Sequence, residues 1–103
     1  MLKGTKKVYL LKEEGTSRYK IGVAINPSKR LTNLQTGNSE KIILVEIFET
    51  EYAQKLEKSL HNMYSHKRTN GEWFELSLED EIKFIAFCEK INKNLYYLDI
   101  NRI

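Results

Sequence analysis

Three side chains suited to binding or reacting with a phosphate lie at nearly regular spacing in the first third of the chain. Lys20 follows Tyr9 by eleven residues and precedes Arg30 by ten. If Tyr9 and Lys20 lie on two strands joined by a four-residue loop, the hairpin places them directly across from each other. Arg30 then falls in the first turn of the next helix. The spacing therefore predicts that a phenol, an amine and a guanidinium meet at one end of a small sheet.

Each of these side chains has a possible role in phosphate chemistry. Asn26 followed by Pro27 is a favoured helix start, and helix N-termini attract anions, so Arg30 is placed to hold phosphate oxygens. A lysine that is crowded by cations and partly desolvated loses its proton more easily, which makes both Lys20 and Tyr9 candidates for a general base. Taken singly, Tyr9 is typical of a core residue and Lys20 of a solvent-facing strand residue.

A carboxylate and an imidazole share one face of a helix predicted from about Tyr52 to His66. Glu57 and His61 are four residues apart, so both project from the same side of the helix. Such a pair can hold Mg²⁺ or Mn²⁺, with the carboxylate as the main ligand. Taken alone, Glu57 is more typical of an exposed acid on a lysine-rich helix.

Apolar periodicity predicts the elements that position these residues. Two strands, around 7–11 and 19–23, alternate so that one face of each is apolar. We expect the opposite face to be basic and open, and Gly22 to leave room there for a ligand or backbone. The residues predicted on this face are Lys7, Tyr9, Arg18, Lys20 and Gly22.

Further patterns complete the predicted fold. A helix runs from Asn26 to Gly37 and a third strand covers 42–49. The segment 69–71 is a turn, 72–76 is a short extended piece, and Ser77 with Asp80 forms a capping box for a last helix. The predicted fold is α+β, with a small antiparallel three-stranded sheet flanked by helices.

Composition limits the class of protein. The chain of 103 residues is predicted to be one domain, 1–103, with a motif core at about 7–77 and a C-terminal helix and extension at 78–103. Cys88 is the single cysteine, which excludes an internal disulfide and a thiolate zinc site and favours a cytoplasmic, intracellular setting. No apolar run approaches the roughly 18 residues of a membrane span, and the start has no signal-peptide pattern. The net charge of +3 permits nucleic-acid binding without requiring it.

The motifs resemble those of the GIY-YIG nuclease superfamily. Lys7-Val8-Tyr9 occupies the place of the first motif and Lys20-Ile21-Gly22 the place of the second, while Arg30 matches the helix arginine and Glu57 the metal-binding glutamate. Gly71-Glu72-Trp73-Phe74 is similar to a compact branch described as phage or DNA-binding domains. Because Lys20 replaces the second tyrosine, Tyr9 and Lys20 both remain candidates for the base.

This resemblance implies hydrolysis of DNA phosphodiesters with one Mg²⁺ or Mn²⁺ on Glu57. Water activated by Tyr9 or Lys20 would attack phosphorus, and Arg30 would neutralise charge on the phosphate oxygens. DNA would be held mostly through its backbone phosphates. A second copy or a partner protein would supply specificity. The supporting or substrate-binding residues are expected to be Tyr19, Gly22, His61, Lys7, Arg18, Lys29 and Trp73.

Two other functions fit the same sequence. The first is a module with this fold that binds nucleic acid without cutting it. The second is a phage or mobile-element protein that acts on a host factor. The presence of Tyr9, Lys20, Arg30 and Glu57 together favours catalysis over both alternatives.

Overall fold

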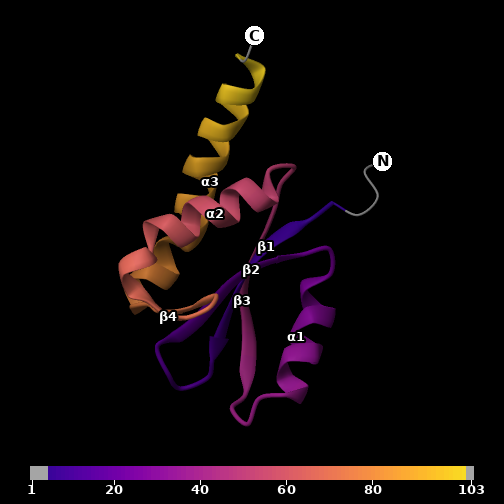
Figure 1. Ribbon diagram of the computed structural model, residues 1–103, viewed down its shortest axis with the longest axis vertical. Coiled ribbons are helices and arrows are strands. Elements are labelled where there is room, and N and C mark those ends of the chain that lie inside the picture. Colours follow the sequence, from indigo (N-terminus) through magenta and orange to yellow (C-terminus); the bar gives the residue numbers. More distant parts are fainter. Residues whose placement is uncertain (1–4, 102–103) are drawn as a thin grey trace.

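The computed structural model describes residues 5–101 (Figure 1). The ends of the predicted domain 1–103, residues 1–4 and 102–103, lie outside this description. The elements in chain order are β1 (Lys7–Glu13), β2 (Arg18–Ala24), α1 (Pro27–Thr36), β3 (Ile42–Glu49), α2 (Ala53–Met63), the 3₁₀ helix η1 (Ser65–Lys67), β4 (Arg68–Asn70), β5 (Trp73–Glu75) and α3 (Leu78–Ile100).

The sheet has five strands in the order β3-β1-β2-β5-β4, and every neighbouring pair is antiparallel. The α+β class is as expected, but the prediction of a three-stranded sheet was wrong. The extended piece around Trp73 joins the sheet by pairing with β2, and the segment expected to be only a turn contributes β4. Both added strands have three residues, too few for an alternating pattern to identify them in the sequence.

Helices cover both faces of this sheet (Figure 1). On one face, Val8, Leu10, Tyr19 and Ile21 pack with buried residues of α2 and α3 in the larger core cluster. On the other, Tyr9 and Leu11 of β1 pack with residues of α1 and β3, including Leu31 and Ile42, in a smaller cluster. The molecule is therefore three layers thick, with α1 on one side and α2 and α3 on the other.

The sequence had suggested that the second face of the hairpin is open, but in the structure this face is covered. Tyr9 is 1% exposed and Lys20 is 7% exposed. Leu11, which pairs with Lys20 across the hairpin, is fully buried. The helix α1 packs over this part of the sheet, since its Leu31 and Leu34 contact the cluster around Tyr9. The alternating pattern of β1 and β2 correctly predicted which residues lie on this face. It did not predict that α1 covers the face.

The predicted helix starts are confirmed. The Asn26 side chain accepts a hydrogen bond from the Lys29 N–H at 3.1 Å, with Pro27 in the first turn. Ser77 and Asp80 form the reciprocal capping box at the start of α3. Cys88 of α3 is buried in the larger core.

The long helix α3 runs away from the sheet at its C-terminal end (Figure 1). The predicted C-terminal extension continues this helix as far as Ile100, and its apolar residues Tyr96, Tyr97, Leu98 and Ile100 are exposed. Within residues 5–101, no helix is both long enough and apolar enough to cross a membrane.

Alkaline pH should destabilise the protein, because several buried groups must ionise. Burial raises the pKa of Tyr64 and of Cys88 to about 12 each, and burial with a hydrogen bond to Glu81 raises the pKa of Tyr19 as well. These groups hold their protons more tightly in the folded state, so the stability they give is complete below about pH 9 and is lost as pH rises toward 12. Urea unfolding at pH 8 and pH 11 measures the loss.

Tyr64 offers a clean control for that titration. Its hydroxyl is buried and has no hydrogen-bond partner among the described residues, so Tyr64→Phe should cost little at pH 8. The same variant should lose less stability than the wild type between pH 8 and pH 11. Identical losses in the two proteins would show that Tyr64 does not contribute.

Candidate functional site

The strand register places Tyr9 across from Gly22, whereas Lys20 pairs with Leu11. The predicted pairing of Tyr9 with Lys20 is therefore wrong by two residues. Pairing with β3 extends β1 to Glu13, so the hairpin loop lies between Glu13 and Arg18 and is closed by the Thr16 N–H and hydroxyl on the Glu13 carbonyl. Tyr9 and Lys20 still share a face of the sheet as diagonal neighbours.

Gly22 is needed because the Tyr9 ring lies across it. A Cβ built on Gly22 would overlap the Tyr9 hydroxyl and the ring carbon that bears it. The absence of a side chain at Gly22 thus lets the Tyr9 ring cross β2. The room that sequence reasoning assigned to a ligand or backbone is taken by Tyr9 itself.

The Tyr9 hydroxyl lies among charged groups from three other parts of the chain. Burial raises the pKa of Tyr9 above its ordinary value; a hydrogen bond from the Arg30 guanidinium and its charge act in the opposite direction, and the charges of Glu72 and Glu57 raise the pKa further. Tyr9 is consequently a neutral phenol at neutral pH. Arg30, not Lys20, is the cation that acts on it.

Lys20 is held by an ion pair with Glu72. Its Nζ lies 2.9 Å from Glu72 Oε1, and its side chain is 9% exposed whereas that of Glu72 is 43% exposed. Glu72 therefore covers Lys20 from the solvent side. The ammonium also lies 5.7 Å from the centre of the Trp73 ring. A buried ammonium needs such a counter-ion, and Glu72 supplies it.

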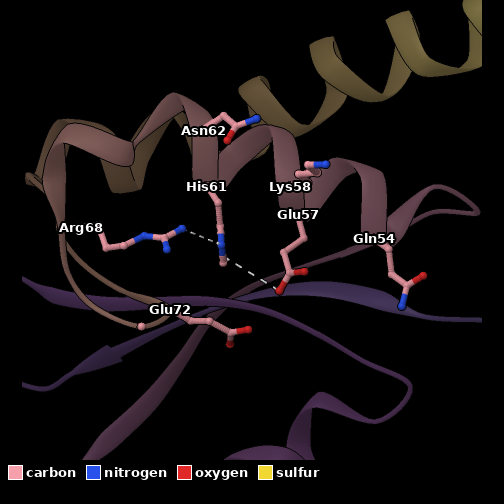
Figure 2. Close-up of a pocket in the computed structure, with 8 residues that line it drawn as sticks. Gln54, Glu57, Lys58, His61, Asn62, Arg68 and Glu72 are labelled. Atoms are coloured by element: carbon pink, nitrogen blue, oxygen red, sulfur yellow. Dashed lines mark hydrogen bonds and ion pairs between the residues drawn. The ribbon is translucent and has the colours of Figure 1, made fainter.

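Glu57 projects from α2 into an open pocket of about 600 Å³ (Figure 2). Burial raises the pKa of Glu57, and the charge of Glu72 raises it further. The Glu57 and Glu72 side chains approach this space from α2 and from the β4–β5 turn (Figure 2). The other lining residues are Gln54, Lys58, His61, Asn62, Arg68 and Gly71.

His61 completes the edge of β2 where β5 stops. The pairing of β5 with β2 ends at Lys20. At Ile21, the backbone N–H donates to the Glu72 carbonyl at 3.3 Å, and the carbonyl accepts from His61 Nε2 at 2.9 Å. Arg68 Nη2 donates to His61 Nδ1 at 3.2 Å (Figure 2). Because Ile21 offers only an acceptor and Arg68 only donors, these two contacts match the His61 tautomer that carries its proton on Nε2.

Both ring nitrogens of His61 are thus engaged in holding the fold. Glu57 Oε2 lies 4.0 Å from His61 Nε2. A role for His61 beside Glu57 in holding a metal stays a prediction. His61 fixes the strand edge next to Gly22.

The remaining predicted supporting residues lie around the site or away from it. Tyr19 faces the larger core and donates a hydrogen bond to Glu81. Arg18 pairs with Glu13 at 2.7 Å and stacks on Trp73 at 4.3 Å, and Lys7 donates to the Ile25 carbonyl at 3.2 Å. Each of these residues thus makes contacts within the fold, and the expected supporting or substrate-binding roles stay predictions. Lys29 is exposed next to Arg30.

The structure adds Glu72 to the candidate residues. In the sequence it stood beside Trp73 with no assigned role. The only signal that could have found it was its place in the Gly-Glu-Trp-Phe segment. Its ion pair with Lys20 depends on the pairing of β5 with β2. A strand as short as β5, with three residues, cannot be predicted from its sequence pattern.

The pocket offers oxygen donors to a metal ion, but few of them. Among residues 5–101, no group of three or more His, Cys, Asp or Glu side chains is close enough together to hold one. The Glu57 carboxylate and the Gln54 amide line the same pocket. Oxygen atoms are the ligands that Mg²⁺ and Mn²⁺ prefer, and Mg²⁺ commonly keeps several waters. The donor set therefore fits a partly hydrated ion held mainly by Glu57.

Gly22→Ala should destabilise the protein by about 1–3 kcal/mol, since the added methyl group overlaps the Tyr9 ring. Gly37→Ala is the matched control, because nothing lies within 4 Å of a Cβ there and its φ of −99° suits alanine. Urea unfolding measures both variants. In a Tyr9→Ala background the cost of Gly22→Ala should disappear, and an undiminished cost there would contradict the assigned overlap.

Comparison with known proteins places the chain in a family. No curated protein and no solved structure matches it. The family model described as the T5orf172 domain matches residues 6–89, a span that runs from β1 into α3 and includes Tyr9, Lys20, Arg30, Glu57 and Glu72. This is a phage-associated domain related to nuclease-type modules. The match covers most of the chain, which therefore belongs to the T5orf172 domain family.

Proposed function

We propose that this protein is a small endonuclease that hydrolyses DNA phosphodiesters with the help of Mg²⁺ or Mn²⁺, using a site of the GIY-YIG type. The observation that carries the proposal is that Glu57 lines an open pocket together with Glu72, which pairs with Lys20, while the charges of Arg30, Glu57 and Glu72 all act on the Tyr9 phenol. Membership of a phage-type, nucleic-acid-related family supports it.

In this proposal Tyr9 and Arg30 bind the scissile phosphate. Tyr9 is a neutral phenol, so it donates a hydrogen bond to a phosphate oxygen in place of accepting a proton. Arg30 is exposed and shares its guanidinium with the Tyr9 hydroxyl, so it is placed to pair with the same phosphate. Together they stabilise the charge that gathers on the non-bridging oxygens as water attacks.

Glu57 is the group that would hold the metal ion. When bound, the ion would stabilise negative charge on the leaving 3′ oxygen. Because burial and Glu72 together raise the pKa of Glu57, a cation at this carboxylate relieves an unfavourable charge. Lys20 supplies a fixed positive charge beside the same pocket.

A module that binds nucleic acid without cutting it remains the second candidate. It is favoured by the sparse ligand set, since no cluster of three or more metal-binding side chains lies within the described part of the chain. Its surface chemistry would be the same, so only an assay of bond cleavage separates the two.

Supercoiled plasmid should be nicked or linearised in the presence of Mg²⁺ or Mn²⁺, and EDTA should stop the reaction. Glu57→Gln should abolish cleavage while leaving DNA binding largely intact, because it removes the metal ligand and not the phosphate contacts. Glu79→Gln, at an exposed position of α3, is the control and should keep full activity. Binding without any cleavage by the wild type would favour the non-cutting module.

DNA binding should fall steeply with salt. The exposed cations that flank the pocket and the start of α1 are Lys29, Arg30, Lys58 and Arg68. If they contact backbone phosphates, the plot of log affinity against log salt should have a slope that corresponds to roughly three or more phosphate contacts. Fluorescence anisotropy with a labelled duplex measures it. A flat response would point to a protein partner in place of DNA.

A further inference from the structure

Hydrolysis at this site requires a group that takes a proton from water. Tyr9 was the first candidate, but burial raises its pKa and makes it a poor base at neutral pH. Lys20 was the second, but its ammonium is held in an ion pair at 2.9 Å. Neither of the two residues predicted from the sequence is therefore suited to act as the general base.

Glu72 has the position that such a base needs. One of its carboxylate oxygens, Oε1, accepts from Lys20, and among the described residues no partner is seen for Oε2. The side chain is 43% exposed, so water reaches it. The carboxylate lines the same pocket as Glu57 and its charge acts on both Glu57 and Tyr9.

The backbone of Glu72 holds the residue in place. Its carbonyl accepts the Ile21 N–H at 3.3 Å, and it follows Gly71, whose φ of 58° lets the chain turn tightly between β4 and β5. Glu72 is therefore tied to β2 twice, through Ile21 and through Lys20. The charged or titratable groups near it are Lys20 from β2, Tyr9 from β1, Glu57 and His61 from α2, and Arg68 from β4.

We propose that Glu72 is the general base that activates the attacking water, with Lys20 orienting its carboxylate. The inference rests on the nuclease function proposed above. Glu72 accepts a proton from water as the water oxygen forms its bond to phosphorus. The bond from phosphorus to the 3′ oxygen breaks, and its electron pair stays on that oxygen, which is protonated by solvent. The products are a 5′-phosphate and a 3′-hydroxyl, and Glu72 releases its proton to solvent.

A purely structural role for Glu72 makes a different prediction. If Glu72 only neutralises Lys20, then removing the charge of Glu72 matters only while Lys20 is present. If Glu72 takes the proton, removing its carboxylate slows the reaction whether or not Lys20 is there. The effect of Glu72→Gln in a Lys20→Met background therefore separates the two roles.

The experiment compares initial rates of plasmid nicking with Mg²⁺ for the wild type, Glu72→Gln, Lys20→Met and the double variant. The double variant removes both members of the ion pair, so no buried charge is left without a partner and the fold should persist; urea unfolding checks this. Glu75→Gln on the same hairpin is the matched control, since Glu75 bonds Ser17 outside the site.

Glu72→Gln should lower the rate roughly 10²-fold or more in both backgrounds, the usual size of a general-base contribution. In Glu72→Ala, added formate should restore part of the rate, and chloride should not. Equal rates for Lys20→Met and the double variant, with a wild type that cleaves, would overturn the role of Glu72 and leave the nuclease proposal intact. A wild type that cleaves no DNA with either metal would overturn both.

Discussion

The contact between the Tyr9 ring and the backbone of Gly22 is the constraint on which the candidate site depends. Since Gly22 has no side chain, the phenol crosses β2 and its hydroxyl comes under the influence of Arg30, Glu57 and Glu72. The helix α1 covers the rest of the ring and brings Arg30 to the hydroxyl. A larger residue at Gly22 would move the phenol away from these charged groups.

The edge of β2 explains why these groups meet where they do. Pairing with β5 stops at Lys20, and at Ile21 the backbone groups are satisfied by His61 and by the Glu72 carbonyl. A further paired strand would cover this region. Instead His61 of α2 and Glu72 of the β4–β5 turn bond the backbone of Ile21, and both residues line the pocket. Like charge on Glu57 and Glu72 is tolerated because Lys20 lies against Glu72, and it favours a cation at this place.

The local features of the fold could be predicted from the sequence and the long-range ones could not. Asn26-Pro27, the Ser77–Asp80 capping box and the strand at 42–49 depend on a few adjacent residues, and all are confirmed. The hairpin register depended on β3 extending β1 past Lys12. The strand β5 depends on pairing with β2 across some fifty residues of chain, and β4 in turn pairs only with β5. The sequence therefore pointed to the candidate residues, but it paired Tyr9 with Lys20 where the structure pairs Tyr9 with Gly22 and Lys20 with Leu11, and it gave Glu72 no role.

One crystal structure would test the account most directly, that of the Lys20→Met/Glu72→Gln variant with Mn²⁺ and a short DNA duplex. Anomalous scattering would locate the manganese ion. Our account predicts one manganese ion on Glu57, with a backbone phosphate within hydrogen-bond distance of both the Arg30 guanidinium and the Tyr9 hydroxyl. A phosphate bound elsewhere, or manganese away from Glu57, would contradict the claim that these residues form a phosphodiester-cleaving site.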